Sequence, residues 1–294
     1  ATTYAQAETT FTDMRPYFGI IGRDAPLFLV NGNHDGELTW EIPGRQSPDL
    51  PIWSTHLRQL YYPNPVPNTF YSGSSSIDPL LGSVRDGYYA WEWGDALFVV
   101  LDPYWYTTVK PGYDDPASGW NWTLGREQYE WLRSTLANSG SRYKLIFIHH
   151  LVGGNAEGRG GVEVASLYEW GGNNIDGSYG FEPYRPGWDL PIHQLLVRYE
   201  VNAVFHGHDH VFVKQELDGI IYQEVPQPST ILYNRISLAD EFGYTGDVVY
   251  GSSGHLRVTV APDGVTVEYV RSYLPGDESA GQVNGQVDFS YTFK

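Results

Sequence analysis

The stretch Ala203-Val204-Phe205-His206-Gly207-His208-Asp209-His210 joins a short apolar run directly to three histidines. Two earlier stretches have the same pattern: residues 143–150 (YKLIFIHH) end on a histidine pair, and residues 27–36 (LFLVNGNHDG) run into Asn-His-Asp. Short apolar runs bounded by turn residues predict buried strands. Because mixed α/β proteins carry functional loops at the carboxyl ends of their strands, the three polar clusters are expected on loops held by a rigid sheet.

The segments between these clusters predict a chain in which helices and strands are mixed. We expect a helix from residue 3 to about residue 14, ending near Pro16, and further helices over residues 125–138 and from Pro191 onward. Apolar or alternating runs predict strands over residues 26–31, 88–93, 96–101, 143–148, 202–205, 211–215, 219–224, 256–261 and 265–271. Three segments rich in glycine, proline and aromatic residues, 37–86, 103–122 and 153–189, are predicted to be loops that form a rim above the clusters.

The composition narrows the class of protein and its partners. The 294 residues suit a single large domain spanning residues 1–294, and the absence of cysteine excludes a disulfide scaffold. With 18 basic and 35 acidic side chains the formal charge is −17, which argues against a nucleic-acid groove or an anionic membrane surface as the main partner. No apolar run approaches the ~20 residues of a membrane span. The absence of cysteine, with a single methionine, predicts a secreted protein, extracellular or periplasmic.

Six of the nine histidines lie in the three clusters, and their chemistry suits a metal ion. Imidazole with Asn or Asp oxygens and no thiolate is the ligand set of zinc, iron or manganese. Taken singly, Asn-His-Asp is usually a turn and a histidine pair is usually structural. Since all three clusters follow strands, a shared metal site is the favoured interpretation. His208 and His210 flank Asp209, so both side chains can face the same way.

At these residues the sequence resembles the calcineurin-like metallophosphoesterases, the superfamily that includes the purple acid phosphatases. The matching motifs are residues 32–35 (GNHD), 149–150 (HH) and 207–210 (GHDH). The resemblance implies an α/β fold, a four-layer α/β/β/α sandwich with mixed sheets, that holds two divalent metal ions at one edge. It implies that the second metal is bound by Asn33, His149 and His208, that the first is bound by His210, and that His34 faces the phosphoryl group with its tautomer held by Asp35. His150 is the alternative to His149, and His206 is assigned a structural role.

The chain departs from the family at its start. The family's first two motifs, Asp-X-His and Gly-Asp-X-X-Asp, supply three ligands, and neither pattern occurs in the 294 residues. The first metal is therefore left with His210 alone, and the N-terminal strands of the fold are missing from this chain. We expect an upstream segment in the native protein, either outside this sequence or held as a separate, cleaved polypeptide partner.

The implied activity is metal-dependent hydrolysis of a phosphate monoester or diester in a phosphorylated small molecule, by attack of a metal-bridging hydroxide on phosphorus. The alternative is a catalytically inactive structural or surface-binding protein with the same fold. A carbohydrate-binding β-module with a structural metal is a third reading, which the three ordered histidine clusters disfavour. Arg159 is assigned to a solvated turn in preference to a phosphate contact. Most of the aromatic rings in the loops are expected to pack the loops down, and the others to contact substrate.

Overall fold

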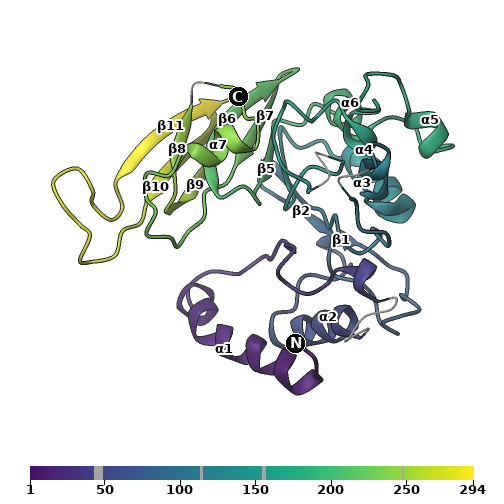
Figure 1. Cartoon of the computed structure of the whole chain (residues 1–294), viewed down its shortest axis with the longest axis horizontal. Helices are drawn as coiled ribbons and strands as arrows, with labels where there is room; N and C mark the ends of the chain where they lie inside the picture. Colours follow the sequence, from purple (N-terminus) through teal and green to yellow (C-terminus); the bar gives the residue numbers. More distant parts are fainter. Residues whose placement is uncertain (43–48, 113–114, 154–156, 247) are drawn as a thin grey trace.

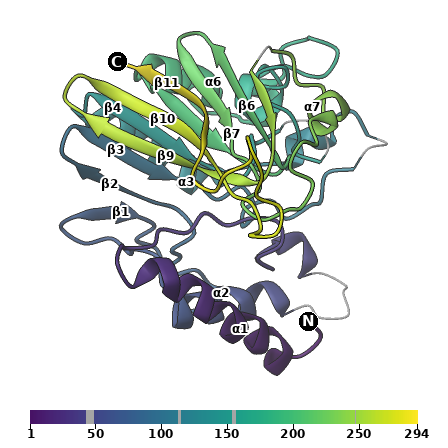
Figure 2. The same ribbon diagram turned by 90° about the vertical axis from the view of Figure 1, so that its left-hand side faces the viewer.

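Two β-sheets packed face to face form the body of the protein (Figures 1 and 2). The structure is a computed structural model, and it describes residues 1–42, 49–112, 115–153, 157–246 and 248–294. The larger sheet has eight strands in the order β1-β2-β3-β4-β5-β7-β6-β8, and the smaller has three in the order β11-β10-β9. The strands are β1 (Tyr71–Gly73), β2 (Tyr89–Trp93), β3 (Ala96–Val100), β4 (Tyr143–Phe147), β5 (Ala203–His206), β6 (Val211–Leu217), β7 (Ile220–Glu224), β8 (Val249–Gly251), β9 (Gly254–Ala261), β10 (Gly264–Arg271) and β11 (Val287–Phe293).

The centre of the larger sheet is parallel and its margins are antiparallel. Strands β3, β4, β5 and β7 run parallel to one another, whereas β1 pairs antiparallel with β2, β2 with β3, and β6 with both β7 and β8. The apolar runs that predict β4 and β5 are explained by burial, since every residue of β5 and all but the last of β4 are buried. The mixed α/β fold predicted from the sequence is therefore confirmed.

Each face of the larger sheet packs against a different layer. On one face, Leu132 and Leu136 of α3 (Gly125–Asn138), Trp170 of α4 (Tyr168–Gly171) and Leu195 of α6 (Ile192–Arg198) form the main core with the sheet. On the other face, Leu145 and other apolar side chains of the larger sheet pack against the smaller sheet. The described residues thus supply three layers, α/β/β, of the four that the family resemblance implies.

Two helices at the start of the chain lie side by side, apart from the sandwich (Figures 1 and 2). They are α1 (Tyr4–Gly22) and α2 (Leu50–Tyr61), joined by ring contacts such as Phe18 against Tyr62 with centroids 5.0 Å apart. The prediction that the first helix ends near Pro16 is wrong: α1 continues through the proline. Phe18 packs on Tyr62 just beyond the proline, and this tertiary contact offsets the backbone hydrogen bond that proline cannot make.

The excursion over residues 37–86 was expected to be a loop, and α2 within it shows that this prediction is wrong. The buried face of α2 includes Ser54, Thr55 and Arg58, so the helix shows little apolar periodicity in the sequence. Further elements lie in segments for which no element was predicted: α5 (Phe181–Tyr184), α7 (Ser237–Glu241), and the one-turn helices η1 (Thr39–Glu41) and η2 (Ser118–Asn121), together with α4, β1, β8 and β11. Among the described residues, no helix is both long and apolar enough to cross a membrane.

Residues 26–31 are extended but do not form the predicted strand. The backbone of Leu29 is bonded by a side chain instead: its N–H donates to Asn64 Oδ1 at 3.0 Å, and Asn64 Nδ2 donates to its carbonyl at 3.2 Å. The Phe28 ring stacks on Trp91 at 4.2 Å. The Asn64 amide thus makes the hydrogen bonds to the N–H and the carbonyl of Leu29 that a neighbouring strand would otherwise make.

Candidate metal centre

Parallel pairing of β4 and β5 brings two histidine clusters to one edge of the larger sheet. The last paired residues are Phe147 and Phe205, and the pairing continues beyond the strands. The N–H of Ile148 donates to the Phe205 carbonyl at 3.1 Å, and the N–H of Gly207 donates to the carbonyl of His149 at 2.9 Å. This backbone connection places the segment after β5 beside the segment after β4, as the sequence predicts for neighbouring parallel strands.

Three of the predicted ligands meet at this edge. His149 Nε2 lies 2.9 Å from Asn33 Oδ1 and 3.1 Å from His208 Nδ1. The rings of His149 and His208 have centroids 5.0 Å apart. Asn33 and His208 lie 116 and 59 positions from His149 in the sequence. Each nevertheless brings an atom that can carry a lone pair beside His149 Nε2.

The hydrogen bonding of His208 fixes which of its ring nitrogens faces the other two side chains. His208 Nε2 lies 3.0 Å from the carbonyl oxygen of Glu157. A carbonyl only accepts, so Nε2 carries the hydrogen and Nδ1 of the neutral ring presents a lone pair. Burial lowers the pKa of His208 to about 4 and that of His149 to about 3. Both rings are therefore neutral at neutral pH, which is the form that binds a metal.

The three converging atoms suit one divalent cation. Adjacent ligand atoms that each lie ~2.1 Å from a six-coordinate ion are separated by ~3.0 Å, close to the 2.9 and 3.1 Å observed here. Two imidazoles and an amide oxygen form a ligand set suited to zinc, manganese or iron. The described part of the chain contains no group of three or more His, Asp or Glu side chains arranged to hold a metal, so an ion held here would need the Asn33 amide oxygen as a third donor beside the two imidazoles.

His34 and His210 lie at the exposed side of this cluster. Burial is the largest cause of the lowered pKa of His149, and the nearby His208 is the next. His210 and His34 contribute smaller electrostatic effects in the same direction, so both histidines lie within electrostatic reach of His149. The backbone φ angles of His208 and His210 are +86° and +60°, a region that few non-glycine residues adopt. Strained backbone of this kind is found at functional sites, where the surroundings enforce it.

Arg159 and Asp209 hold the strained turn in place. Arg159 Nη1 donates to the carbonyl of His208 at 2.9 Å and to Asp209 Oδ1 at 2.8 Å. The buried Asp209 carboxylate also accepts the Gly160 N–H at 2.9 Å and the Tyr244 hydroxyl at 2.7 Å. The assignment of Arg159 to a solvated turn is therefore wrong: its side chain is only 23% exposed and positions the backbone of a candidate ligand.

Asp35 closes the loop that carries Asn33. Its Oδ2 accepts the N–H of Gly32 at 2.6 Å, and its own N–H donates to the Gly32 carbonyl at 3.1 Å. Gly32 lies against the His149 ring, where an added Cβ would come within 3.1 Å of Nδ1. The expected hydrogen bond between Asp35 and His34 is not among those of the described residues, and Oδ2 of this carboxylate bonds the backbone of its own turn.

A buried ion network anchors the same loop to α2. Glu37, two residues beyond Asp35, accepts from Arg58 Nε at 2.5 Å and from Asn31 Nδ2 at 3.2 Å. Arg58 also pairs with Asp86 at 2.9 Å, and all three charged side chains are nearly inaccessible to solvent. Because a buried charge requires a partner, this network ties the loop to the helix that the sequence did not predict.

The two remaining histidines of the clusters are buried behind the site. His150 Nδ1 lies 3.1 Å from the Tyr104 hydroxyl, and its ring packs edge-on against Trp122 at 4.3 Å. His206 Nδ1 lies 2.8 Å from the buried carboxyl of Glu224. Burial lowers the pKa of His206 to about 4 and raises that of Glu224 well above its usual range. His149, rather than the alternative His150, is thus the member of the pair that lies beside Asn33.

Most of the large rings expected above the site are packed into the protein. Trp105, Trp120, Trp122 and Trp170 are at most 5% exposed, and Trp120 stacks on Tyr184 at 4.6 Å. These rings fill the space beneath the loops, as expected for most of the aromatic residues there.

The residues that position the ligands were missed from the sequence. Only Asp209 carries a local signal, since it lies between two histidines. Arg159, Tyr244 and Arg58 reach the site from distant segments, and their sequence surroundings do not distinguish them from ordinary loop or helix residues.

Comparisons with known proteins identify the family and the fold of the chain. The family model described as calcineurin-like phosphoesterase matches residues 5–212, a span that contains all the predicted ligands. The structure of PhoD superimposes with a TM-score of 0.56 at 15% identity, covering 90% of this chain and 52% of that one. The purple acid phosphatase PPD1 from yellow lupin seeds gives a TM-score of 0.43 at 16% identity, covering 97% of this chain and 48% of that one.

The chain spans about half the length of both proteins. No curated protein matches it significantly by sequence. The family model nevertheless covers well over half of the chain, and the chain belongs to the calcineurin-like phosphoesterase family.

Proposed function

We propose that this protein hydrolyses phosphate esters with the help of two divalent metal ions of the zinc, manganese or iron type. Asn33, His149 and His208 would hold one ion, and His210 would contribute to the other. The observation that carries this proposal is the convergence of Asn33 Oδ1 and His208 Nδ1 on His149 Nε2 within 3.1 Å. When bound, such ions supply Lewis acidity, which lowers the pKa of water and offsets the negative charge of the phosphate.

The residues of the chain itself would position the substrate and move a proton. His34 is exposed beside the three ligands, on a turn that the Asp35 carboxylate holds closed. From there its imidazole can donate a hydrogen bond to a phosphoryl oxygen or a proton to the leaving oxygen. Arg159 is the cation next to the site, and it is engaged with Asp209 and the His208 carbonyl. Its role would be to keep His208 in place.

Substitution of His34 tests this division of roles. Turnover of p-nitrophenyl phosphate and of its bis-ester is measured with added Mn²⁺ or Zn²⁺, alongside bound metal by elemental analysis. For His34→Ala we expect a kcat lowered by ~10²–10⁴-fold with little loss of metal, because general acid catalysis contributes about that much. His255→Ala, at an exposed histidine on β9, is the matched control and should leave both quantities unchanged. Equal losses of metal and turnover would instead make His34 a ligand.

A non-catalytic role is the second candidate, and one observation favours it. Of the residues that the family resemblance assigns to the first metal, this chain supplies only His210. If the metal-loaded chain bound one equivalent of metal but hydrolysed neither the monoester nor the bis-ester, a structural or surface-binding role would be supported. Restoration of turnover by a polypeptide that carries the two upstream motifs would support the hydrolase and the predicted N-terminal partner. Export from the cytoplasm stays a prediction from composition.

A further inference from the structure

A pocket of about 220 Å³ lies beside His34, between α1 and the loop that carries the candidate ligand Asn33. His34 and Asp35 line one part of it. The pocket is smaller than the ~300–1,000 Å³ of sites that enclose a whole small molecule, so its size suits one part of a substrate. An apolar cavity of ~150 Å³ is enough to hold a benzene ring.

The helix side of this pocket is apolar and accessible. Phe11, Met14 and Phe18 of α1 line it, and their spacing of i, i+3 and i+7 places them on one face of the helix. Met14 is 42% exposed, and both phenylalanine rings are half-buried. The two rings contact Tyr62 with centroid distances of 6.0 and 5.0 Å. Residues 29 and 30 of the extended segment add two half-buried aliphatic side chains.

The charged side chains of the pocket do not favour an anion. Among the described residues that line it, Arg58 is the only lysine or arginine, and it is buried between Glu37 and Asp86. Asp35 adds a further carboxylate to the lining. A group that carries its own phosphate or carboxylate would be repelled here, whereas an uncharged apolar group gains free energy by leaving water.

His34 connects this pocket to the reaction proposed above. The imidazole is assigned to a phosphoryl oxygen or to the leaving oxygen, and the same residue lines the pocket. In the hydrolysis, the oxygen of water bonds to phosphorus and the bond from phosphorus to the ester oxygen breaks. The ester oxygen then leaves with a proton, as an alcohol or a phenol. The carbon atoms attached to that oxygen would extend past His34 toward the apolar face of α1.

We propose that this pocket receives the organic group of the phosphate ester, and that this group is an uncharged aryl or alkyl group. The proposal rests on the proposed hydrolase function and narrows its substrates to esters of apolar alcohols or phenols. Sugar phosphates and nucleotides would gain less from the pocket, because their leaving groups carry hydroxyls or further charges that the apolar lining does not bind.

Met14 provides a direct test of binding, because it is the only methionine in the chain. Protein labelled with ¹³C in the methionine methyl group therefore gives one methyl NMR signal, from a residue of the pocket. Titration of the full chain with 2-naphthol should move this signal saturably, whereas glycerol should not. Phe18→Ala should weaken the binding about fivefold or more. Tyr17→Ala is the matched control, since Tyr17 is on the same helix, is 65% exposed and does not line the pocket.

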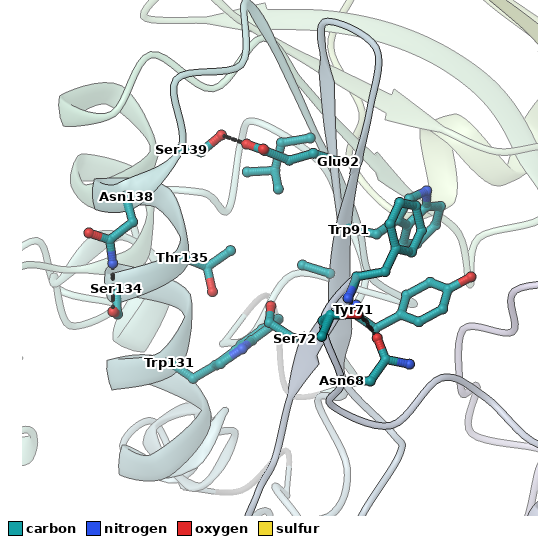
Figure 3. Close-up of a pocket in the computed structure, with 14 residues that line it drawn as sticks. Asn68, Tyr71, Ser72, Trp91, Glu92, Trp131, Ser134, Thr135, Asn138 and Ser139 are labelled. Atoms are coloured by element: carbon teal, nitrogen blue, oxygen red, sulfur yellow. Dashed lines mark hydrogen bonds between the residues drawn. The ribbon is translucent and has the colours of Figure 1, made fainter.

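The groove between α3 and strands β1 and β2 is a competing place for an aromatic ring (Figure 3). Its volume is about 640 Å³, and Trp131 of α3 is among its lining residues. Neither Met14 nor any other residue of α1 lines this groove. A ring bound there would leave the Met14 signal unchanged, so the NMR titration distinguishes the two positions.

The selectivity between two esters tests the assignment to the substrate. Phenyl phosphate and 2-naphthyl phosphate release phenols of similar acidity and differ by one fused ring. With added Mn²⁺ or Zn²⁺, kcat/KM for the naphthyl ester should be about tenfold or more higher, because the additional carbons are buried. Met14→Gln keeps the length of a partly exposed side chain and should lower this preference about threefold or more, whereas Tyr17→Ala should preserve it. Thermal unfolding shows whether each variant is folded, and Met14→Gln decides if Phe18→Ala is not.

Three outcomes would overturn the proposal. A Met14 signal that does not respond to 2-naphthol, or equal weakening by Tyr17→Ala and Phe18→Ala, would show that the pocket does not bind the ring. Equal kcat/KM for the two esters would leave the hydrolase in place and remove the pocket from substrate recognition. Failure of the proposed function is distinguishable: neither ester would be hydrolysed while 2-naphthol still moved the Met14 signal. The pocket would then bind an apolar group, and its assignment to a substrate would be overturned.

Discussion

The two sides of the candidate metal centre are held by different kinds of interaction. His149 and His208 follow adjacent parallel strands, and backbone hydrogen bonds carry the pairing of β4 and β5 up to the ligands themselves. Asn33 lies on a turn that follows an extended segment with no strand partner among the described residues. That turn is held by the Asp35 carboxylate and, through Glu37, by a buried ion network on α2.

Because the two sides are held differently, we expect mutations on each side to affect stability and site geometry differently. A ladder of backbone bonds tolerates the loss of any one side chain, because the bonds do not depend on it. A buried charge network fails when one member is removed, since the others are left unpaired in a low-dielectric interior. We therefore call these regions the sheet-held side and the helix-held side, and expect the helix-held side to be the more sensitive to single substitutions.

Removal of Arg58 should have the largest effect on folding. Arg58→Met leaves the carboxylates of Glu37 and Asp86 buried without their cation, which should lower the free energy of unfolding by ~3–5 kcal/mol. Urea denaturation measures this change. Arg133→Met is the matched control, because Arg133 pairs with Glu130 at 2.9 Å on the surface and should cost under ~1 kcal/mol. Similar losses for the two variants would contradict the helix-held description.

Loss of a ligand on the sheet-held side should affect metal binding rather than folding. His149→Ala should lower the affinity for Zn²⁺ about 100-fold or more, because removing a direct ligand costs at least as much as removing an outer hydrogen bond. Competition with a chromogenic chelator measures the affinity. His255→Ala should bind zinc like the unmodified protein. An unchanged affinity for His149→Ala would remove His149 from the ligand set.

Disruption of the contact between Arg159 and the turn should have an intermediate effect. Arg159→Gln removes the charged donor to the His208 carbonyl and to Asp209. We expect a ~10–100-fold loss of zinc affinity, as for other groups that orient metal ligands. Arg142→Gln is the control, since Arg142 is exposed and bonds to the carbonyl of Pro262 far along the chain. No change in affinity for Arg159→Gln would show that the turn keeps its shape without this side chain.

The smallest predicted effect concerns the extended segment before Asn33. Asn64→Ala removes the side chain that bonds both the N–H and the carbonyl of Leu29, and should lower the free energy of unfolding by ~1–3 kcal/mol. Asn138→Ala, at an exposed position near the end of α3, should cost less than half as much. If Asn64→Ala were neutral, the segment would be held instead by the Tyr89 hydroxyl, which donates to the Leu29 carbonyl at 2.9 Å, and by the stacking of Phe28 on Trp91.

The same contrast shows what the sequence could predict. The strands β4 and β5 are short apolar runs that end in histidines, so both the strands and the candidate ligands after them could be read locally. Asn33 was predicted from the Asn-His-Asp motif, although residues 26–31 before it do not form the predicted strand. Residues 32–35, 149–150 and 207–210 could be singled out from the order of the motifs, and the family that this order indicates is confirmed by the match of the family model to residues 5–212.

The rest depended on contacts between distant segments. The helix α2 buries polar and charged side chains, so its helical face carries no apolar signal. Asp35 was expected to orient His34, yet its carboxylate bonds the Gly32 backbone. Arg159 was assigned to a solvated turn because nothing near it in the sequence shows that Asp209, 50 positions away, accepts its N–H. Such polar pairing is set by the folded chain and has no periodicity of its own.

The most direct test of the metal centre is anomalous diffraction from crystals of the protein soaked in Zn²⁺ or Mn²⁺. We predict an anomalous peak at the centre of Asn33 Oδ1, His149 Nε2 and His208 Nδ1, ~2.0–2.2 Å from each atom. A soaked crystal with no peak at this position, or with the ion bound by His150 in place of His149, would contradict the account.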